Sequence, residues 1–307
     1  MIKKLLTAST VVALLTSPAL AEDRVSIGTG GTGGAFYAVG AGMADLLTKK
    51  LDGVTANAEV TGASIENVRR VSAGEMTIGF SSASTLFAGK NAQAPFDESQ
   101  NVAAIAMLYP AVLQVAATKA SGATSIADLA DLKISVGPPG SNSSVLSTRL
   151  LQAHDAFNMD NISFLSYGEA TGAIKNGNLD GSLILSGTPA SAFIELSTTT
   201  DVTILPVDPV AVEGLLKEFP FYQLTEIPAG LYKGTDVAVS AIGDPAILFA
   251  SEDADPELIY QITKTLFDNL DTLGQVHPAA KKISMDWAFN TPIELHEGAR
   301  RYFDEHQ

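Results

Sequence analysis

The chain has 307 residues, of which 46% are hydrophobic and 17% charged. This composition excludes a disordered protein, and the length suffices for two domains. The formal net charge of −15 argues against nucleic-acid binding, because phosphate backbones attract basic surfaces. Cysteine is absent, which excludes disulfides, thiolate metal sites and cysteine nucleophiles. The four histidines form no HxxxH or HExxH pair, so we predict neither a metal nor a cofactor.

Residues 1–21 have the pattern of a secretory signal peptide. Lys3 and Lys4 precede the apolar segment 5–15, and Ala19-Leu20-Ala21 is a small-x-small cleavage sequence. The apolar segment is too short to span a bilayer. We therefore predict export to a bacterial periplasm, cleavage after Ala21, and no stable membrane insertion of the mature chain.

Strand-forming and helix-forming segments alternate along the remaining chain, which predicts an α/β fold. The first strand–helix–strand–helix–strand series is predicted at 24–28, 35–51, 54–60, 65–73 and 77–80. The same order recurs about 105 residues later, at 133–137, 143–154, 162–165, 170–176 and 182–185. This recurrence predicts two lobes of similar construction.

Two segments are predicted to connect the lobes. The apolar run 102–118 is broken at Tyr109-Pro110, and Ser125–Asp128 then caps a new helix. A later strand region, 237–250, is interrupted at Gly243-Asp244-Pro245 and precedes a helix predicted at 256–273. The predicted domains are 22–119 with 235–307 for the first lobe and 120–234 for the second. Two connections form a hinge, and a hinge implies a cleft.

Five predicted strands run into small polar residues at the start of a helix. These junctions are Gly28–Gly34, Thr61–Ser64, Ser81–Ser84, Gly137–Ser144 and Ser186–Pro189, and none carries a charged side chain. Helix N-termini present unpaired N–H groups, and ligands of open α/β sheets bind at the carboxyl ends of strands. The pattern predicts a site for a small anion that uses no arginine. Ordinary helix capping is the alternative reading of any single junction.

Two enzyme-like motifs are incomplete. Gly28, Gly30 and Gly33 match the GxGxxG pattern of dinucleotide-binding proteins, but Asp52 comes too early to be the required acid, and Glu59, near the right place, is followed by a second helix-cap loop. The segment Gly79–Ala83 falls one residue short of GxSxG, and no histidine is placed as a base. We therefore predict that the protein is not an enzyme. Arg149, two turns into its helix, is expected to form a salt bridge or to snorkel rather than to contact a ligand.

Several stretches, in this order along the chain, resemble the TAXI family of TRAP-transporter solute-binding proteins. They are Gly30–Gly34 with Phe36-Tyr37, Val60–Asn67, Leu108–Pro110, Val136–Ser141, Phe219–Tyr222, Ile227–Gly230, His277–Ala280, and His296–Ala299 with Arg301-Tyr302. The resemblance implies a type II periplasmic-binding-protein fold, with two α/β lobes joined by a two-strand hinge around a central ligand cleft. It also implies capture of a small carboxylate, often glutamate or 2-oxoglutarate, for a sodium-coupled membrane transporter.

The sequence departs from that family at two places. An acid common after the third strand is replaced by Ser81-Ser82-Ala83, and Tyr109-Pro110-Ala111 stands where many members have Tyr-Pro-Glu. Both departures remove a partner for a ligand ammonium group. We therefore expect an organic or keto acid rather than an amino acid, although Glu169 remains a possible ammonium partner.

The predicted ligand-binding residues come from both lobes. The expected carboxylate donors are Gly33, Gly34, Ser141, Asn142, Ser143, Gly187 and Thr188. Tyr37 and Tyr109 are expected to provide a wall or a hydroxyl group. Ser64, Asn67, Ser81 and Ser82 are expected to complete the first-lobe side.

The expected partners are a small anionic metabolite and the membrane subunits of a TRAP transporter, with the protein itself a monomer. The alternatives are a periplasmic sensory protein that presents the same ligand to a membrane receptor, and, less favoured, a periplasmic hydrolase.

Overall fold

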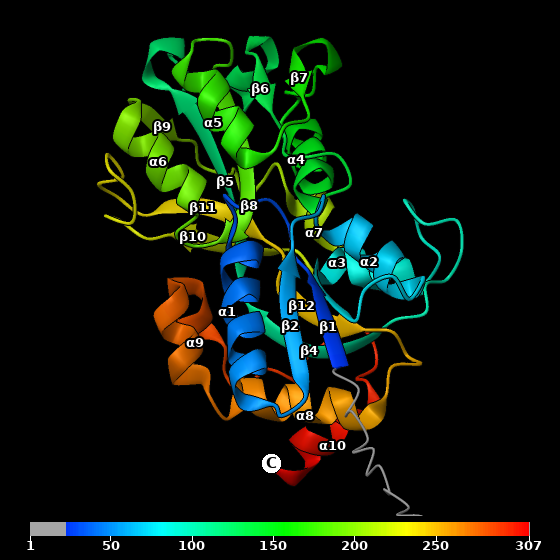
Figure 1. The fold of residues 1–307 in the computed structure, drawn as a ribbon. Coiled ribbons are helices and arrows are strands. Elements are labelled where there is room, and N and C mark those ends of the chain that lie inside the picture. The colour runs from blue at the N-terminus through cyan, green and yellow to red at the C-terminus, as the bar shows by residue number, and fades with distance from the viewer. Residues whose placement is uncertain (1–22, 307) are drawn as a thin grey trace, which may run out of the picture.

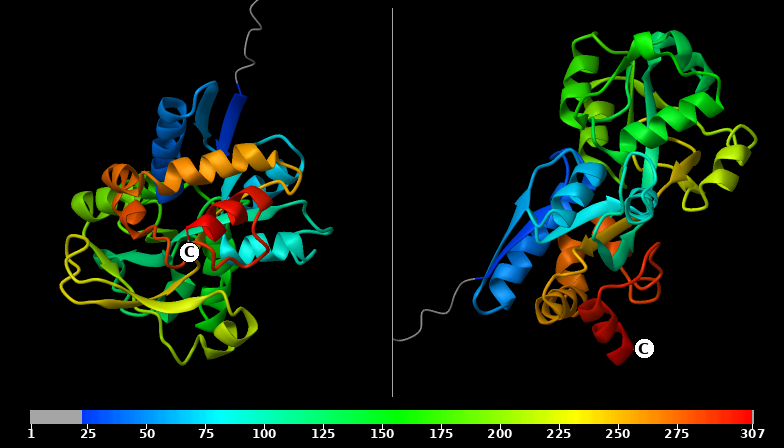
Figure 2. Two further views of the ribbon diagram at one scale, coloured as in Figure 1. Left: turned by 90° about the horizontal axis from the view of Figure 1, so that it is seen from below. Right: turned by 90° about the vertical axis from the view of Figure 1, so that its right-hand side faces the viewer.

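The structure, a computed structural model, describes residues 23–306, so the predicted signal peptide and its cleavage site lie outside the described residues. The chain folds into two lobes, each built around one β-sheet with helices packed against it (Figure 1). The predicted α/β class with two lobes is confirmed. Figure 2 shows that the C-terminal helix lies at the end of the first lobe that is remote from the second.

The first lobe contains a five-stranded sheet in the order β2-β1-β3-β12-β4. Its strands are β1 (Asp23–Gly28), β2 (Val54–Glu59), β3 (Ile78–Ser82), β4 (Ala103–Tyr109) and β12 (Ala246–Ala250). Strand β1 runs parallel to β2 and β3, whereas β12 is antiparallel to β3 and β4. The helices are α1 (Ala35–Lys50), α2 (Ser64–Ser72), α3 (Ala83–Lys90), α8 (Pro256–Phe267), α9 (Leu270–Val276) and α10 (Glu297–Glu305).

The second lobe contains a sheet in the order β10-β11-β5-β8-β6-β7, with β9 paired to β5. Its strands are β5 (Ala111–Thr118), β6 (Ile134–Ser135), β7 (Ile162–Ser163), β8 (Gly181–Gly187), β9 (Val202–Ile204), β10 (Gln223–Ile227) and β11 (Val239–Gly243). Its helices are α4 (Asn142–Ala153), α5 (Tyr167–Lys175), α6 (Ser191–Thr199) and α7 (Glu213–Glu218).

The chain changes sheets at Pro110 and again at Asp244-Pro245. Strands β5 and β11 pair with each other in the second sheet, through Ile242 opposite Leu113. The predicted boundaries at 119/120 and 234/235 placed both strands in the first lobe. The sequence pattern of a buried apolar strand does not depend on which sheet the strand joins. Pro110 was therefore the only sequence signal of the first change of sheet. We propose that the lobes comprise 23–110 with 245–306, and 111–244.

The helix predicted at 256–273 is two helices, α8 and α9. Asn269, which begins α9, has the non-helical backbone angles φ −129° and ψ 31°. Its side-chain amide donates to the carbonyl oxygen of Thr265 at 2.8 Å, which closes the end of α8. Asparagine favours such side-chain-to-backbone bonds at helix ends, so it interrupts an otherwise continuous apolar pattern.

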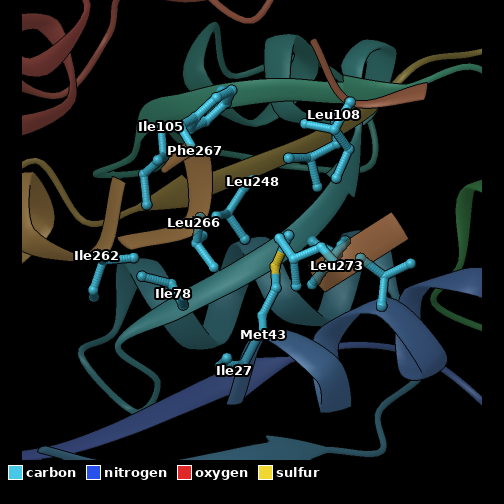
Figure 3. Packing of buried hydrophobic residues seen from close by; sticks show 14 of the residues in the cluster. Ile27, Met43, Ile78, Ile105, Leu108, Leu248, Ile262, Leu266, Phe267 and Leu273 are labelled. Atoms are coloured by element: carbon cyan, nitrogen blue, oxygen red, sulfur yellow. The ribbon is translucent and has the colours of Figure 1, made fainter. Parts of the chain in front are cut away.

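The first-lobe core lies between the sheet and the helices α1 and α8. Figure 3 shows Met43 of α1 among Ile27, Ile78 and Leu248 of the sheet and Leu266 of α8. All of them are fully or almost fully buried. This packing holds α1 at a fixed position on the sheet, and α1 begins at the carboxyl end of β1.

Met43→Ala is predicted to lower the free energy of unfolding by about 2–5 kcal/mol, because it leaves a cavity in this core. The matched control is Met159→Ala, since Met159 is 58% exposed; that change is expected to fall within about 0.5 kcal/mol of the parent. Urea denaturation measures both values. Equal effects of the two substitutions would contradict the described packing.

Candidate functional site

A cavity of about 40 Å³ lies between the lobes, and we call it the inner cavity. Six predicted site residues line it: Gly34, Ser64, Ser82, Ser141, Asn142 and Ser143. The other lining residues are Gly30, Gly31, Ala35, Phe36, Ala63, Ala111, Pro138, Ser166, Tyr167, Leu185 and Ser186. None of these residues carries a charged side chain, so any polar recognition here depends on backbone groups, hydroxyls and one amide.

The start of α4 supplies N–H donors to this cavity from the second lobe. Ser141 caps the helix, because its Oγ accepts from the N–H of Ser144 at 3.3 Å. The N–H groups of Asn142 and Ser143, in the first turn, have no acceptor within residues 23–306. Helix N-termini carry a partial positive charge, so this pair of donors suits an anion.

The start of α1 approaches from the first lobe. Gly34 precedes the helix in extended conformation and offers no side-chain cap. The N–H of Phe36, in the first turn, likewise has no acceptor within the described part of the chain. Residues whose N–H groups are unpaired, from helices of both lobes, therefore line the inner cavity.

Other N–H groups at helix starts, including one of α1, are already paired across the cleft. The N–H of Ala35 donates to Ser186 Oγ at 2.9 Å, and that of Ile65 donates to the Gly140 carbonyl oxygen at 3.1 Å. From the opposite side, Ala192 N–H donates to the Gly33 carbonyl oxygen at 3.1 Å. The structure is thus a closed arrangement, and the inner cavity has room for only a few waters. A larger ligand enters only if these bonds open or lengthen.

At the third predicted junction, Ser81–Ser84, a carboxylate of the protein itself binds the start of α3. Asp244 is fully buried, and its Oδ1 accepts from the N–H of Ser84 at 3.2 Å in the first turn of α3. Its Oδ2 accepts from the Ser84 hydroxyl, and from Asn142 Nδ2 at 2.7 Å. Because Ser84 belongs to the first lobe and Asn142 to the second, Asp244 joins both lobes at the crossing. The N-terminus of α3 is consequently not available to a ligand.

Burial raises the pKa of Asp244 to about 6, against the lowering effect of its hydrogen bonds to Ser84 and Asn142. A raised carboxyl pKa means that the folded state binds the proton more tightly than the unfolded state. The contribution of Asp244 to stability is therefore fully present below its unfolded pKa and is lost as pH rises through about 6.

Asp244→Asn removes this titration. We predict that the difference in unfolding free energy, parent minus variant, grows as pH falls from about 7 to about 4. Thermal or urea unfolding at a series of pH values measures it, and the subtraction cancels the titration of the other carboxyls. A difference that is flat or shrinks on acidification would contradict the buried, desolvated state of Asp244.

Two predicted site residues hold the first lobe together instead of lining the inner cavity. Asn67 is fully buried, and its amide nitrogen donates to the carbonyl oxygens of Thr29 at 2.7 Å and Phe80 at 2.8 Å. Its Oδ1 accepts from the hydroxyl of Thr61. Ser81 is also fully buried, and its hydroxyl donates to the carbonyl oxygen of Ser82.

The remaining predicted residues do not line the inner cavity. They are Gly33, Tyr37, Tyr109, Gly187 and Thr188. Tyr109 is fully buried, which raises the pKa of its hydroxyl, and that hydroxyl has no partner within the described residues. A Cβ at Gly187 would lie 2.8 Å from the Tyr109 ring, so this glycine allows close packing. Thr188 Oγ1 accepts from Lys282 Nζ at 3.3 Å.

Sequence reasoning missed two polar lining residues, Ser166 and Tyr167, whereas Ser186 belongs to the fifth predicted junction but was not among the predicted ligand-binding residues. Ser166 and Glu169 form a capping box at the start of α5, and this S-x-x-E signal would have moved the predicted helix start from Ala170 to Tyr167. The Tyr167 hydroxyl donates to the Leu185 carbonyl oxygen at 2.7 Å, and burial raises its pKa to about 12. Glu169 is exposed and serves the cap, and its bonds to Ser166 lower its pKa.

Residues 27–306 match the NMT1-like family. The chain belongs to that family. Within the described residues, no helix has the length and apolarity to cross a bilayer, and no three histidine, aspartate or glutamate side chains are grouped as a metal site requires.

Solved structures of binding proteins share the fold. The periplasmic binding protein BugD is 16% identical with a TM-score of 0.59, over 92% of this chain and 95% of that chain. MatC from Rhodopseudomonas palustris, solved with bound malate, is 15% identical with a TM-score of 0.58, over 92% and 97%. A histidine kinase sensor domain similar to periplasmic binding proteins is 12% identical with a TM-score of 0.50, over 86% and 96%. The periplasmic-binding-protein fold is therefore confirmed.

Proposed function

We propose that this protein is an exported solute-binding protein that captures a small organic acid in the inner cavity and delivers it to a sodium-coupled TRAP transporter. The observation that carries the proposal is the convergence of unpaired N–H groups from α1 and α4 on a cavity without charged side chains. Binding by backbone donors needs no arginine, in keeping with the resemblance to the TAXI family.

The magnitudes allow useful affinity from these donors. A hydrogen bond to a charged group contributes about 1.5–3 kcal/mol, and a micromolar complex needs about 8 kcal/mol. The N–H groups of Phe36, Asn142 and Ser143 supply much of this, and the hydroxyls of Ser64 and Ser82 line the same cavity. Each helix N-terminus adds up to about 2 kcal/mol where it is partly buried.

The same cavity favours an organic or keto acid over an amino acid. No acidic side chain lines it, so a ligand ammonium group would lose its hydration without gaining a partner. The nearby carboxylate of Asp244 is already hydrogen-bonded to Ser84 and Asn142. MatC, which has a similar fold, was solved with the dicarboxylate malate. Closure around such a ligand would give the transporter a distinct state to recognise.

The runner-up function is a sensory protein that presents the same ligand to a membrane receptor. The fold match to a histidine kinase sensor domain supports it. Neighbouring genes for large membrane permease subunits would favour the transport function, whereas genes for a receptor would favour the sensory one.

Ser141→Asp tests the site directly. Aspartate remains a good helix cap, but it places a carboxylate at the start of α4, where the ligand anion is expected. We predict at least about a hundredfold loss of affinity for 2-oxoglutarate, malate or succinate, whichever the parent binds most tightly. Isothermal titration calorimetry, preceded by a thermal-shift screen of mono- and dicarboxylates, measures it.

The matched control is Asn269→Asp, which adds the same charge at the cap of α9, outside the inner cavity. This variant is expected to bind as the parent does. Two results would contradict the proposal: undiminished binding by Ser141→Asp, or much tighter binding of glutamate than of 2-oxoglutarate by the parent.

A further inference from the structure

A second and larger cavity lies between the lobes, and we call it the outer cavity. Its volume is about 320 Å³, within the range of small-molecule sites. The first lobe contributes Ile65 and residues of α3 and the following loop, and the second contributes α4 and residues 218–221. Asn142 lines both cavities, so the two sites are neighbours along the cleft.

Arg149 provides the cationic group of the outer cavity. The guanidinium carbon lies 3.7 Å from the centre of the Phe219 ring, and Nη1 donates to the Tyr222 hydroxyl at 2.6 Å. Within residues 23–306, no carboxylate lies within 4.0 Å of this half-buried guanidinium, in a chain with 34 acidic and 19 basic residues. The expected salt bridge is therefore not formed in the described structure.

Arg301 on α10 shows the contrasting arrangement. Its guanidinium also stacks on an aromatic ring, 3.9 Å from the centre of Tyr260, but it pairs with Glu257 at 2.7 Å. Arginine has five N–H donors in a planar fork that matches a carboxylate. At Arg149 one donor is used on Tyr222, and the fork remains without an anionic partner in the described residues.

The walls of the outer cavity are aromatic and apolar. The rings of Phe87 and Phe221, which belong to different lobes, lie 4.8 Å apart between centres. Val145 adds an aliphatic surface from α4. Thr85 adds a hydroxyl-bearing side chain to the same lining and is 5% exposed. A flat apolar ligand with one polar end would contact both the apolar walls and the Thr85 side chain.

The surrounding charges limit the ligand to a single negative charge. Glu218 lines the outer cavity and is exposed. Burial and the charge of Asp244 raise the pKa of Tyr222, the hydrogen-bond partner of Arg149, whereas Arg149 lowers it, so Asp244 also acts on this region. A dianion would meet both acids with one arginine to balance them.

We propose that the outer cavity is a separate binding site for an aromatic monocarboxylate. The carboxylate would pair with the fork of Arg149, and the ring would lie against Phe87, Phe221 and Val145. The proposal does not depend on which ligand the inner cavity takes. Because both lobes line the outer cavity, occupancy there also favours the closed arrangement.

Titration of the exported chain with benzoate, by calorimetry or by ligand-observed NMR, tests this site. We expect saturable binding of benzoate, weaker binding of acetate, which lacks the ring, and weaker binding of the dianion phthalate. Arg149→Gln should lower the benzoate affinity at least about tenfold. Arg301→Gln, which removes the same charge from another stacked arginine, should leave it unchanged.

Further variants separate this proposal from the function proposed for the inner cavity. Ser141→Asp should retain benzoate binding, whereas Arg149→Gln should retain binding of the dicarboxylate or keto acid. Arg149→Lys keeps the charge but loses the fork, so it should bind benzoate with intermediate affinity. Failure of the parent to bind benzoate, undiminished binding by Arg149→Gln, or loss of benzoate binding in Ser141→Asp would overturn the outer site.

Discussion

Unpaired N–H groups at helix starts are the constraint around which the cleft is organised. Each helix leaves N–H groups of its first turn without partners inside the helix, and burying them unpaired is costly. At this cleft, α1, α2 and α6 obtain one acceptor each from the facing lobe, from Ser186, Gly140 and Gly33. The donors that stay unpaired, in the first turns of α1 and α4, define where an anion would complete the structure.

Asp244 resolves the same constraint in a different way. Its carboxylate accepts the N–H of Ser84, and the carbonyl oxygen of the next residue, Pro245, accepts that of Ala83. The hinge itself therefore caps α3. The further bond from Asn142 connects this cap to α4, the helix that lines both cavities. A buried carboxylate at the crossing thus contacts side chains of both lobes.

Much of the fold could be predicted from periodicity and composition, because local patterns determine helices and strands. The crossing strands were harder. Apolar runs such as 102–118 carry no sign of which sheet they join, and Asp244 between Gly243 and Pro245 looks like an ordinary turn residue. Its role depends on Ser84 and Asn142, which are distant in sequence.

The candidate site could be predicted only in part, for a related reason. Ser141, Asn142 and Ser143 line the inner cavity as the helix-start pattern indicated. Asn67 has the same residue chemistry, but its amide is used by Thr29 and Phe80 on neighbouring segments. A polar residue at a helix start can face a ligand or secure its own lobe, and the difference lies in tertiary contacts.

A crystal structure of the protein with its tightest-binding organic acid tests the central claim most directly. The account predicts a ligand carboxylate in the inner cavity, within hydrogen-bond distance of the N–H groups of Asn142 and Ser143 and of Phe36 on the facing lobe. A ligand held chiefly by Arg149 or a lysine, or bound away from the cleft, would contradict it.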